Sequence, residues 1–174
     1  MNIYFILLLR FIHIVAGILW AGSAVSLMFF VKPTMKLVGP TGPQFMQALV
    51  TRRRYPLFMQ STSLATVLAG VVLYFYSSVG LNVFWIRTGP GIGLTLGSLA
   101  ALIAFFVGNF GIGSTSAKMG ALGQKIAASG KPPSPAQLSE LQALEKRLNL
   151  AEWIDFTTLA ISMLTMATAR YWTF

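Results

Sequence analysis

The sequence contains no cysteine, a single histidine and only four acidic residues among its 174 positions. The absence of cysteine excludes disulfide bonds, thiolate metal sites and thiol catalysis. Charged residues make up 10% of the chain, well below the roughly one quarter that is typical of soluble domains. The sequence also lacks a P-loop, the HExxH and GxSxG motifs, and any glutamate placed inside an apolar segment to hold a di-iron centre. No common catalytic motif therefore identifies an enzyme activity.

The hydrophobic residues, 55% of the chain, are concentrated in four long segments. Each segment can cross the ~30 Å of hydrocarbon in a bilayer as a helix. We expect spans at about residues 3–31, 57–78, 92–117 and 150–171, within a single membrane domain of residues 1–174. The sequence therefore predicts an all-α protein built as a transmembrane four-helix bundle.

The formal net charge of +9 is compatible with nucleic-acid binding, but the positions of the basic residues fit membrane topology better. Residues 32–56 contain five Lys or Arg, residues 118–149 also contain five, and the loop at 79–91 contains one. Because basic loops stay in the cytoplasm, we expect the first two of these loops to be cytoplasmic and both termini to be outside. The expected location is the inner (cytoplasmic) membrane, with lipid as the surroundings and no nucleic-acid partner.

The third and fourth spans are expected to continue into the cytoplasm as a helical hairpin over residues 118–149. Gly130 can end the first helix, and Ser134 with Gln137 forms a capping-box pattern that can begin the second. Two apolar stripes should then pack antiparallel. They consist of Met119, Leu122 and Ile126 on one arm, and Leu138, Leu141, Leu144 and Leu148 on the other. A short interfacial helix is also expected between Pro43 and Arg54.

The first span contains Arg10, His13 and Trp20, which share one helical face. Ionisable residues at lipid depth normally face the bundle interior, since exposing them to lipid is costly. His13 is a candidate ligand of haem b or a metal, or a proton relay; alternatively it forms a hydrogen bond between helices. Arg10 can pair with a haem propionate or snorkel outward to the membrane surface. One histidine cannot supply both axial ligands of a bis-histidine haem, so methionine, a second protomer or five-coordinate iron would have to complete the site.

Copper is a weaker candidate than haem. Thioether sulfur is a good ligand for Cu(I), and the chain has eight methionines. They form no dense M-x-x-M-x-x-M array, however, so packing in an apolar core is their more ordinary role. The identity of any metal is left open by the sequence.

A polar stripe follows one face of the fourth span. Asn109 in the third span should lie at the height of Asp155 and is its expected partner. The stripe can line a proton or solute path, or it can hold helices together through hydrogen bonds worth ~0.6 kcal/mol each. Its members in the fourth span are Asp155, Thr158, Ser162 and Thr165.

Residues 11–22, FIHIVAGILWAG, resemble the first span of the CopD-like group of bacterial membrane proteins. This group includes copper-resistance membrane proteins and the membrane portion of some urate oxidases, and it is more distantly similar to the haem-dependent protoporphyrinogen oxidase of bacteria. Residues 130–138, GKPPSPAQL, and 166–171, MATARY, are similar to four-span relatives of the group. The resemblance implies a bacterial inner-membrane protein in which only His13 carries over as a functional residue. The intramembrane lysine and further histidines of the oxidase pattern are missing here.

Three functions from different classes remain open. The first is a structural or accessory membrane subunit, acting in a homo-oligomer or a membrane complex, which the small-residue ridge at Gly93 and Gly97 and the projecting helices favour. The second is a haem- or copper-associated redox domain centred on His13. The third is a small transporter that uses the stripe at Asp155. No catalytic residue is assigned, and the first function accounts for most of the sequence.

Overall fold

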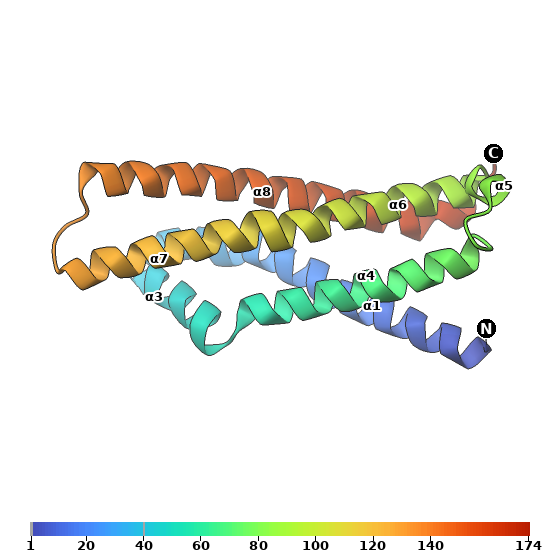
Figure 1. Cartoon of the computed structure of the whole chain (residues 1–174), viewed down its shortest axis with the longest axis horizontal. Coiled ribbons are helices and arrows are strands. Elements are labelled where there is room, and N and C mark those ends of the chain that lie inside the picture. Colours follow the sequence, from blue (N-terminus) through green and yellow to red (C-terminus); the bar gives the residue numbers. More distant parts are fainter. Residues whose placement is uncertain (1, 40) are drawn as a thin grey trace.

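The computed structural model describes residues 2–39 and 41–174, and every regular element within them is helical. Four runs of helix are long and apolar enough to cross a membrane. They are Ile3–Leu37, Tyr55–Ser77, Gly89–Ser129 and Pro135–Tyr171. Figure 1 shows these runs in an elongated bundle, with both chain ends at the same end. The predicted all-α four-helix bundle is confirmed.

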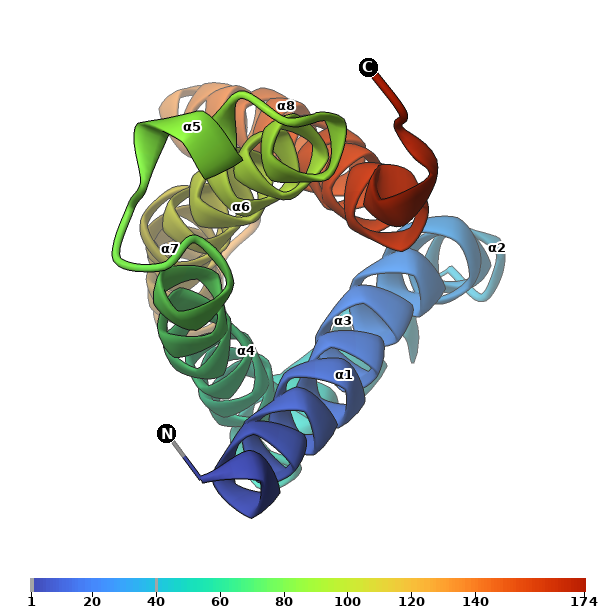
Figure 2. The same ribbon diagram turned by 90° about the vertical axis from the view of Figure 1, so that its right-hand side faces the viewer.

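The long helices form two pairs around the bundle axis (Figure 2). In the first pair α1 (Ile3–Ser26) packs against α4 (Tyr55–Ser77), and in the second α6 (Gly89–Phe106) packs against α8 (Pro135–Thr168). Contacts between the two pairs are fewer. Most large apolar side chains point away from the bundle, as expected where lipid is the surrounding solvent. The chain is a multi-pass membrane protein.

The first helix is longer than the sequence predicts. The expected end of the helix near residue 31 is wrong, because helix continues through α2 (Lys32–Leu37). A π-helical turn, η1 (Leu27–Val31), lies directly before Pro33. Proline lacks an N–H group, and in an α-helix its ring collides with the carbonyl four residues earlier. The wider π turn relieves both problems at the point where they arise, so the helix passes through the proline.

The rest of the first connection is also largely helical. α3 (Thr41–Gln47) continues into a second π-helical turn, η2 (Ala48–Arg52). The short helix predicted between Pro43 and Arg54 is therefore present, and it begins two residues earlier. The second span begins at Tyr55, two residues earlier than expected. Between the second and third spans lies only one short helix, α5 (Val83–Ile86).

The predicted helical hairpin is present. The third span continues through a π-helical segment, η3 (Val107–Ile112), into α7 (Gly113–Ser129), and Gly130 ends it in the left-handed conformation with φ of 61°. The Ser134 hydroxyl accepts from the Gln137 N–H and the Gln137 side chain accepts from the Ser134 N–H, which is the capping box expected at the start of α8. Leu122 is buried, whereas Leu138 near the turn is exposed. The two arms, which project beyond the other helices in Figure 1, therefore pack most closely where they leave the bundle.

Small residues set the distance between α6 and α8. A Cβ atom added at Gly93 would lie 2.8 Å from the Cβ of Ala169, and one at Gly97 would lie 2.6 Å from the Cγ of Met166. Ala104, farther along α6, is completely buried. Because lipid tails are as apolar as leucine, close backbone approach of this kind is a main source of helix association in membranes. After α8 the chain ends with a 3₁₀ turn, η4 (Ala169–Tyr171), which packs on α6.

The glycine contact can be tested with a matched pair of variants. Gly93→Ala is expected to destabilise the protein by about 1–3 kcal/mol, since overpacking a close contact forces the helices apart. Gly120→Ala, at a helical glycine with no atom within 4 Å of the added Cβ, should instead stabilise by about 0.5–1 kcal/mol through helix propensity. Thermal unfolding in detergent, followed by tryptophan fluorescence, measures both. A Gly93→Ala protein as stable as Gly120→Ala would contradict the packing argument.

Candidate functional site

A cavity of about 240 Å³ lies between α4 of the first helix pair and α6 of the second. Its wall is mostly apolar and comes mainly from α4 and α6. The side chains in it that can form hydrogen bonds or bind a metal are His13, Thr66, Tyr74, Thr95, Ser98 and Met166. The cavity exists because the glycine contacts lie within each helix pair, whereas the two pairs meet less closely.

His13 is turned toward α4 and the cavity. Its Nδ1 lies 2.8 Å from the carbonyl oxygen of Thr66, so in the neutral ring Nδ1–H donates and Nε2 carries the lone pair. Within residues 2–39 and 41–174, Nε2 makes no hydrogen bond. A Cβ atom at Gly70 would lie 2.8 Å from the ring Cε1, so glycine is needed for the imidazole to lie against α4. His13 thus contributes one acceptor nitrogen without a partner among the described residues, on a ring that lines the cavity.

Hydroxyl groups link α4 and α6 beside the same cavity. The oxygen atoms of Tyr74 and Thr95 are 2.6 Å apart. Thr95 also donates to the carbonyl of Gly91 at 2.7 Å, so Tyr74 is the donor of the pair. The Tyr74 ring packs edge-on against Trp85, with centroids 5.9 Å apart. Ser98 makes no hydrogen bond to any described residue, so its hydroxyl is available to a ligand.

The other two residues expected in the first-span site lie elsewhere. Arg10 is exposed on the outside of α1 and forms no ion pair with the described residues, which agrees with outward snorkelling. Trp20 is buried in the core with Ala104 and Leu159 and is not part of the cavity wall. Of the predicted constellation, only His13 faces the cavity.

The cavity lacks part of the site that the sequence predicts for haem b. His13 and Met166 do line one space, and imidazole with thioether is a known axial pair for haem iron. The volume of about 240 Å³ is nevertheless below the ~300–1,000 Å³ of pockets for drug-sized ligands, and a porphyrin is a large ligand. Arg10, the expected propionate partner, lies outside the cavity. Among the described residues, no three His, Asp or Glu side chains come together to hold a metal ion.

Asp155 is a second buried polar group, on α8. It is 4% exposed, and its Oδ1 has no hydrogen-bond partner among the described residues. It faces η3, where a Cβ atom at Gly108 would lie 3.5 Å from that oxygen. The amide of Asn109 donates instead to the carbonyl of Phe105, one turn earlier in its own helix, at 2.8 Å. The pairing of Asn109 with Asp155 that the sequence predicts is therefore not formed.

The rest of the polar stripe forms bonds within α8. The hydroxyls of Thr158 and Thr165 donate to backbone carbonyls of their own helix, and Ser162 donates to the sulfur of Met166 at 3.8 Å. Local bonds of this kind satisfy a hydroxyl without a partner helix. Thr158 and Thr165 also donate to the backbone carbonyls of Asp155 and Ser162, but no hydrogen bond joins two side chains of the stripe among the described residues.

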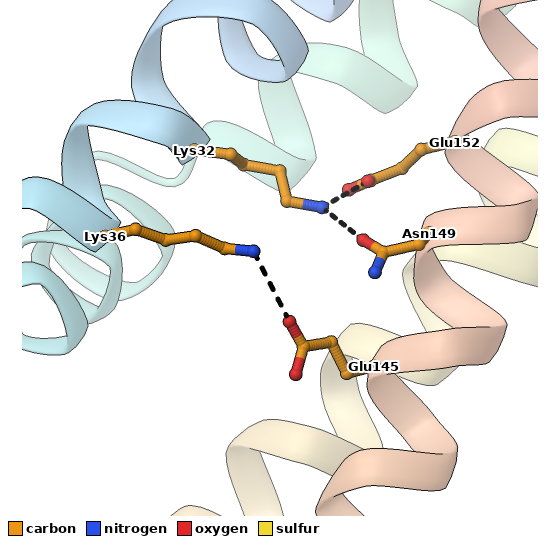
Figure 3. Close-up of polar contacts among 5 residues, drawn as sticks. All are labelled: Lys32, Lys36, Glu145, Asn149 and Glu152. Carbon is orange, nitrogen blue, oxygen red and sulfur yellow. Dashed lines mark hydrogen bonds and ion pairs between the residues drawn. The ribbon is translucent and has the colours of Figure 1, made fainter.

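An ion-pair cluster between α2 and α8 was missed by sequence reasoning. Lys32 contacts Glu152 and donates to the amide oxygen of Asn149 at 3.0 Å, and Lys36 lies 3.9 Å from Glu145 (Figure 3). These contacts tie the extended first helix to α8. The sequence spacing could have indicated this cluster. The two lysines are four residues apart and so share one helical face, and the three acceptors on α8 share another.

Comparisons of the chain with models of protein families, with curated proteins and with solved structures find no match. The function of the site is therefore inferred from the side chains that line it. An apolar wall with one free imidazole nitrogen and one free hydroxyl can hold a small apolar molecule that carries a hydrogen-bond donor.

The orientation of His13 predicts its tautomer. Because the chain has a single histidine, labelling histidine with ¹⁵N gives an NMR spectrum of this ring alone. In the neutral form of the ring we expect the proton on Nδ1, with Nε2 unprotonated. In Gly70→Ala the added methyl group displaces the ring, so this preference should weaken. A wild-type ring protonated on Nε2 would show that the bond to Thr66 is not formed.

Proposed function

We propose that this membrane protein is an accessory subunit of the bacterial inner membrane that binds a small, mostly apolar ligand in the cavity at His13. The observation that carries the proposal is the state of the imidazole. Nδ1 is bonded to Thr66, and Nε2 is free beside a cavity. An ionisable side chain at lipid depth is costly, and a functional site is the default explanation for it.

The chemistry of the wall limits the ligand. Nε2 accepts a hydrogen bond, so the ligand carries a hydroxyl or N–H group, and the Ser98 hydroxyl can bond to a second polar atom. The remaining wall is apolar, so the body of the ligand is apolar or aromatic. A volume of about 240 Å³ is close to eight times the ~30 Å³ that one water molecule occupies in the liquid. A single substituted aromatic ring suits this space.

An accessory role accounts for the rest of the molecule better than catalysis does. The described part of the cavity wall pairs no nucleophile with His13. The arms of α7 and α8 extend beyond the apolar spans and offer a surface for a membrane-complex partner or a second copy. We also propose that the chain is a distant relative of the CopD-like group, on the support of residues 11–22, with a ligand smaller than haem.

The ligand site can be tested by photolabelling. A small phenol that carries a diazirine group is expected to label the cavity wall of the reconstituted protein, and unlabelled phenol should compete. Ser98→Phe fills the cavity and should abolish this labelling. Leu96→Phe, on the same helix but at an exposed position, is the matched control and should preserve it. Peptide mass spectrometry locates the label.

Equal labelling of the two phenylalanine variants would refute the site. His13→Ala should weaken labelling, because the hydrogen-bond acceptor is lost while the space remains. A Soret band in the absorption spectrum of the purified protein, absent from His13→Ala, would instead identify haem as the ligand and overturn the argument from size.

We further propose that both termini face outside. The support is that the two loops with five basic residues each lie at one end of the bundle and both termini at the other (Figure 1), together with the retention of basic loops in the cytoplasm.

Alkaline phosphatase fusions test this orientation, because that enzyme needs disulfide bonds that form outside the cytoplasm. A fusion after Phe174 is expected to be active and a fusion at Gly130 inactive. The reverse pattern would invert the topology.

A further inference from the structure

The chain has four acidic side chains, and three of them have ordinary surroundings. Glu140 and Glu145 are exposed, and Glu152 is paired with Lys32. Asp155 differs, since it is 4% exposed and Oδ1 has no partner in the described residues. It lies one helical turn inside the bundle from Glu152.

The surroundings of Asp155 supply little charge. The facing segments α6, η1 and η3 contain no titratable residue, and the amide of Asn109 in η3 is bonded to Phe105. The nearest charged residue to Asp155 on α8 is Glu152. The charged residue of the first helix that lies on this side is Lys32, and its charge is already neutralised by Glu152. Lys118 on α7 is exposed.

A bare carboxylate in these surroundings is unfavourable. Moving an ion out of water costs several kcal/mol unless a counter-charge and hydrogen bonds compensate it, and here Oδ1 has neither. The neutral acid avoids this cost, as buried ionisable groups commonly do. The geometry therefore favours Asp155 in its protonated form while the Lys32–Glu152 pair is closed.

We propose that Asp155 is a proton-binding site whose occupancy is coupled to the contact between Lys32 and Glu152. When Lys32 leaves Glu152, its ammonium group can stabilise the Asp155 carboxylate, and the O–H bond of the acid breaks to release a proton to water on the side of the ion pair. Glu152 and Asp155 are three residues apart, about 4.5 Å along the axis, within reach of a flexible lysine. Coupling is reciprocal, so protonation of Asp155 also favours the closed pair.

The π-helical segments place this site where the helices can shift. Phe29 in η1 packs edge-on against Phe156, with centroids 5.1 Å apart, and Gly108 in η3 faces Asp155. Both π segments therefore lie at the level of the acid. Such segments occur frequently at functional sites, and they let α2, which carries Lys32, move without unwinding α1. This inference is independent of the ligand cavity at His13.

Infrared spectroscopy of the full chain in proteoliposomes tests the proposal, because four acidic side chains give few carboxyl bands. At neutral pH we expect the carbonyl stretch of a protonated carboxylic acid, lost in Asp155→Asn. Glu152→Gln frees Lys32, so the band should disappear at lower pH than in the wild type. Lys32→Met leaves Glu152 negative, so the band should persist to higher pH.

Lys36→Met is the matched control, since Lys36 pairs with the exposed Glu145, and it should leave the band unchanged. The pH at which the band disappears should move in opposite directions in Glu152→Gln and Lys32→Met. This comparison stays informative even if Asp155→Asn fails to fold. Absence of the acid band at neutral pH would refute the proton site. Shifts of the same sign in the two variants would refute the coupling to the ion pair.

Discussion

Close backbone approach is the constraint on which this bundle depends. In lipid, apolar surface gains little by moving from the outside of a bundle to its inside, so packing at short range has to hold the helices together. Gly93 and Gly97 provide it between α6 and the C-terminal end of the fourth helix, and Gly70 lets the His13 ring of α1 lie against α4. The two helices of each pair therefore pack closely, and the cavity lies where the two pairs meet.

The lipid surroundings also explain which hydrogen bonds the polar side chains form. Most serine and threonine hydroxyls in the spans donate to a carbonyl one turn earlier, so they need nothing from a neighbour. His13 satisfies one nitrogen across a helix contact and leaves the other free. Asp155 leaves an oxygen without a partner in the described structure. His13 lies on α1 and Asp155 on α8, in different helix pairs, which gives the molecule two separate polar sites.

Much of this fold could be predicted from the sequence, because its signals are local. Span length, the left-handed glycine at Gly130 and the capping box at Ser134 each depend on a few adjacent residues. Pro33 was misinterpreted because the proline rule assumes an α-helical register, which the π turn before it changes. The partner of Asp155 was wrong for a related reason, since Asn109 bonds within its own helix. The cavity and the Lys32 cluster depend on how separate helices meet, which no single segment encodes.

The unbroken run from Gly89 to Ser129 has 41 residues, and at 1.5 Å per residue it is ~60 Å long. Beyond the π-helical segment η3 the helix is regular through α7 to the turn at Gly130, so a tilt at η3 would be carried to that turn. α7 has 17 residues and is ~25 Å long, so a tilt of about 5° at η3 displaces its far tip by about 2 Å. A small change in packing around the buried part of this helix is thereby converted into a mechanical displacement that a protein bound at the tip could detect.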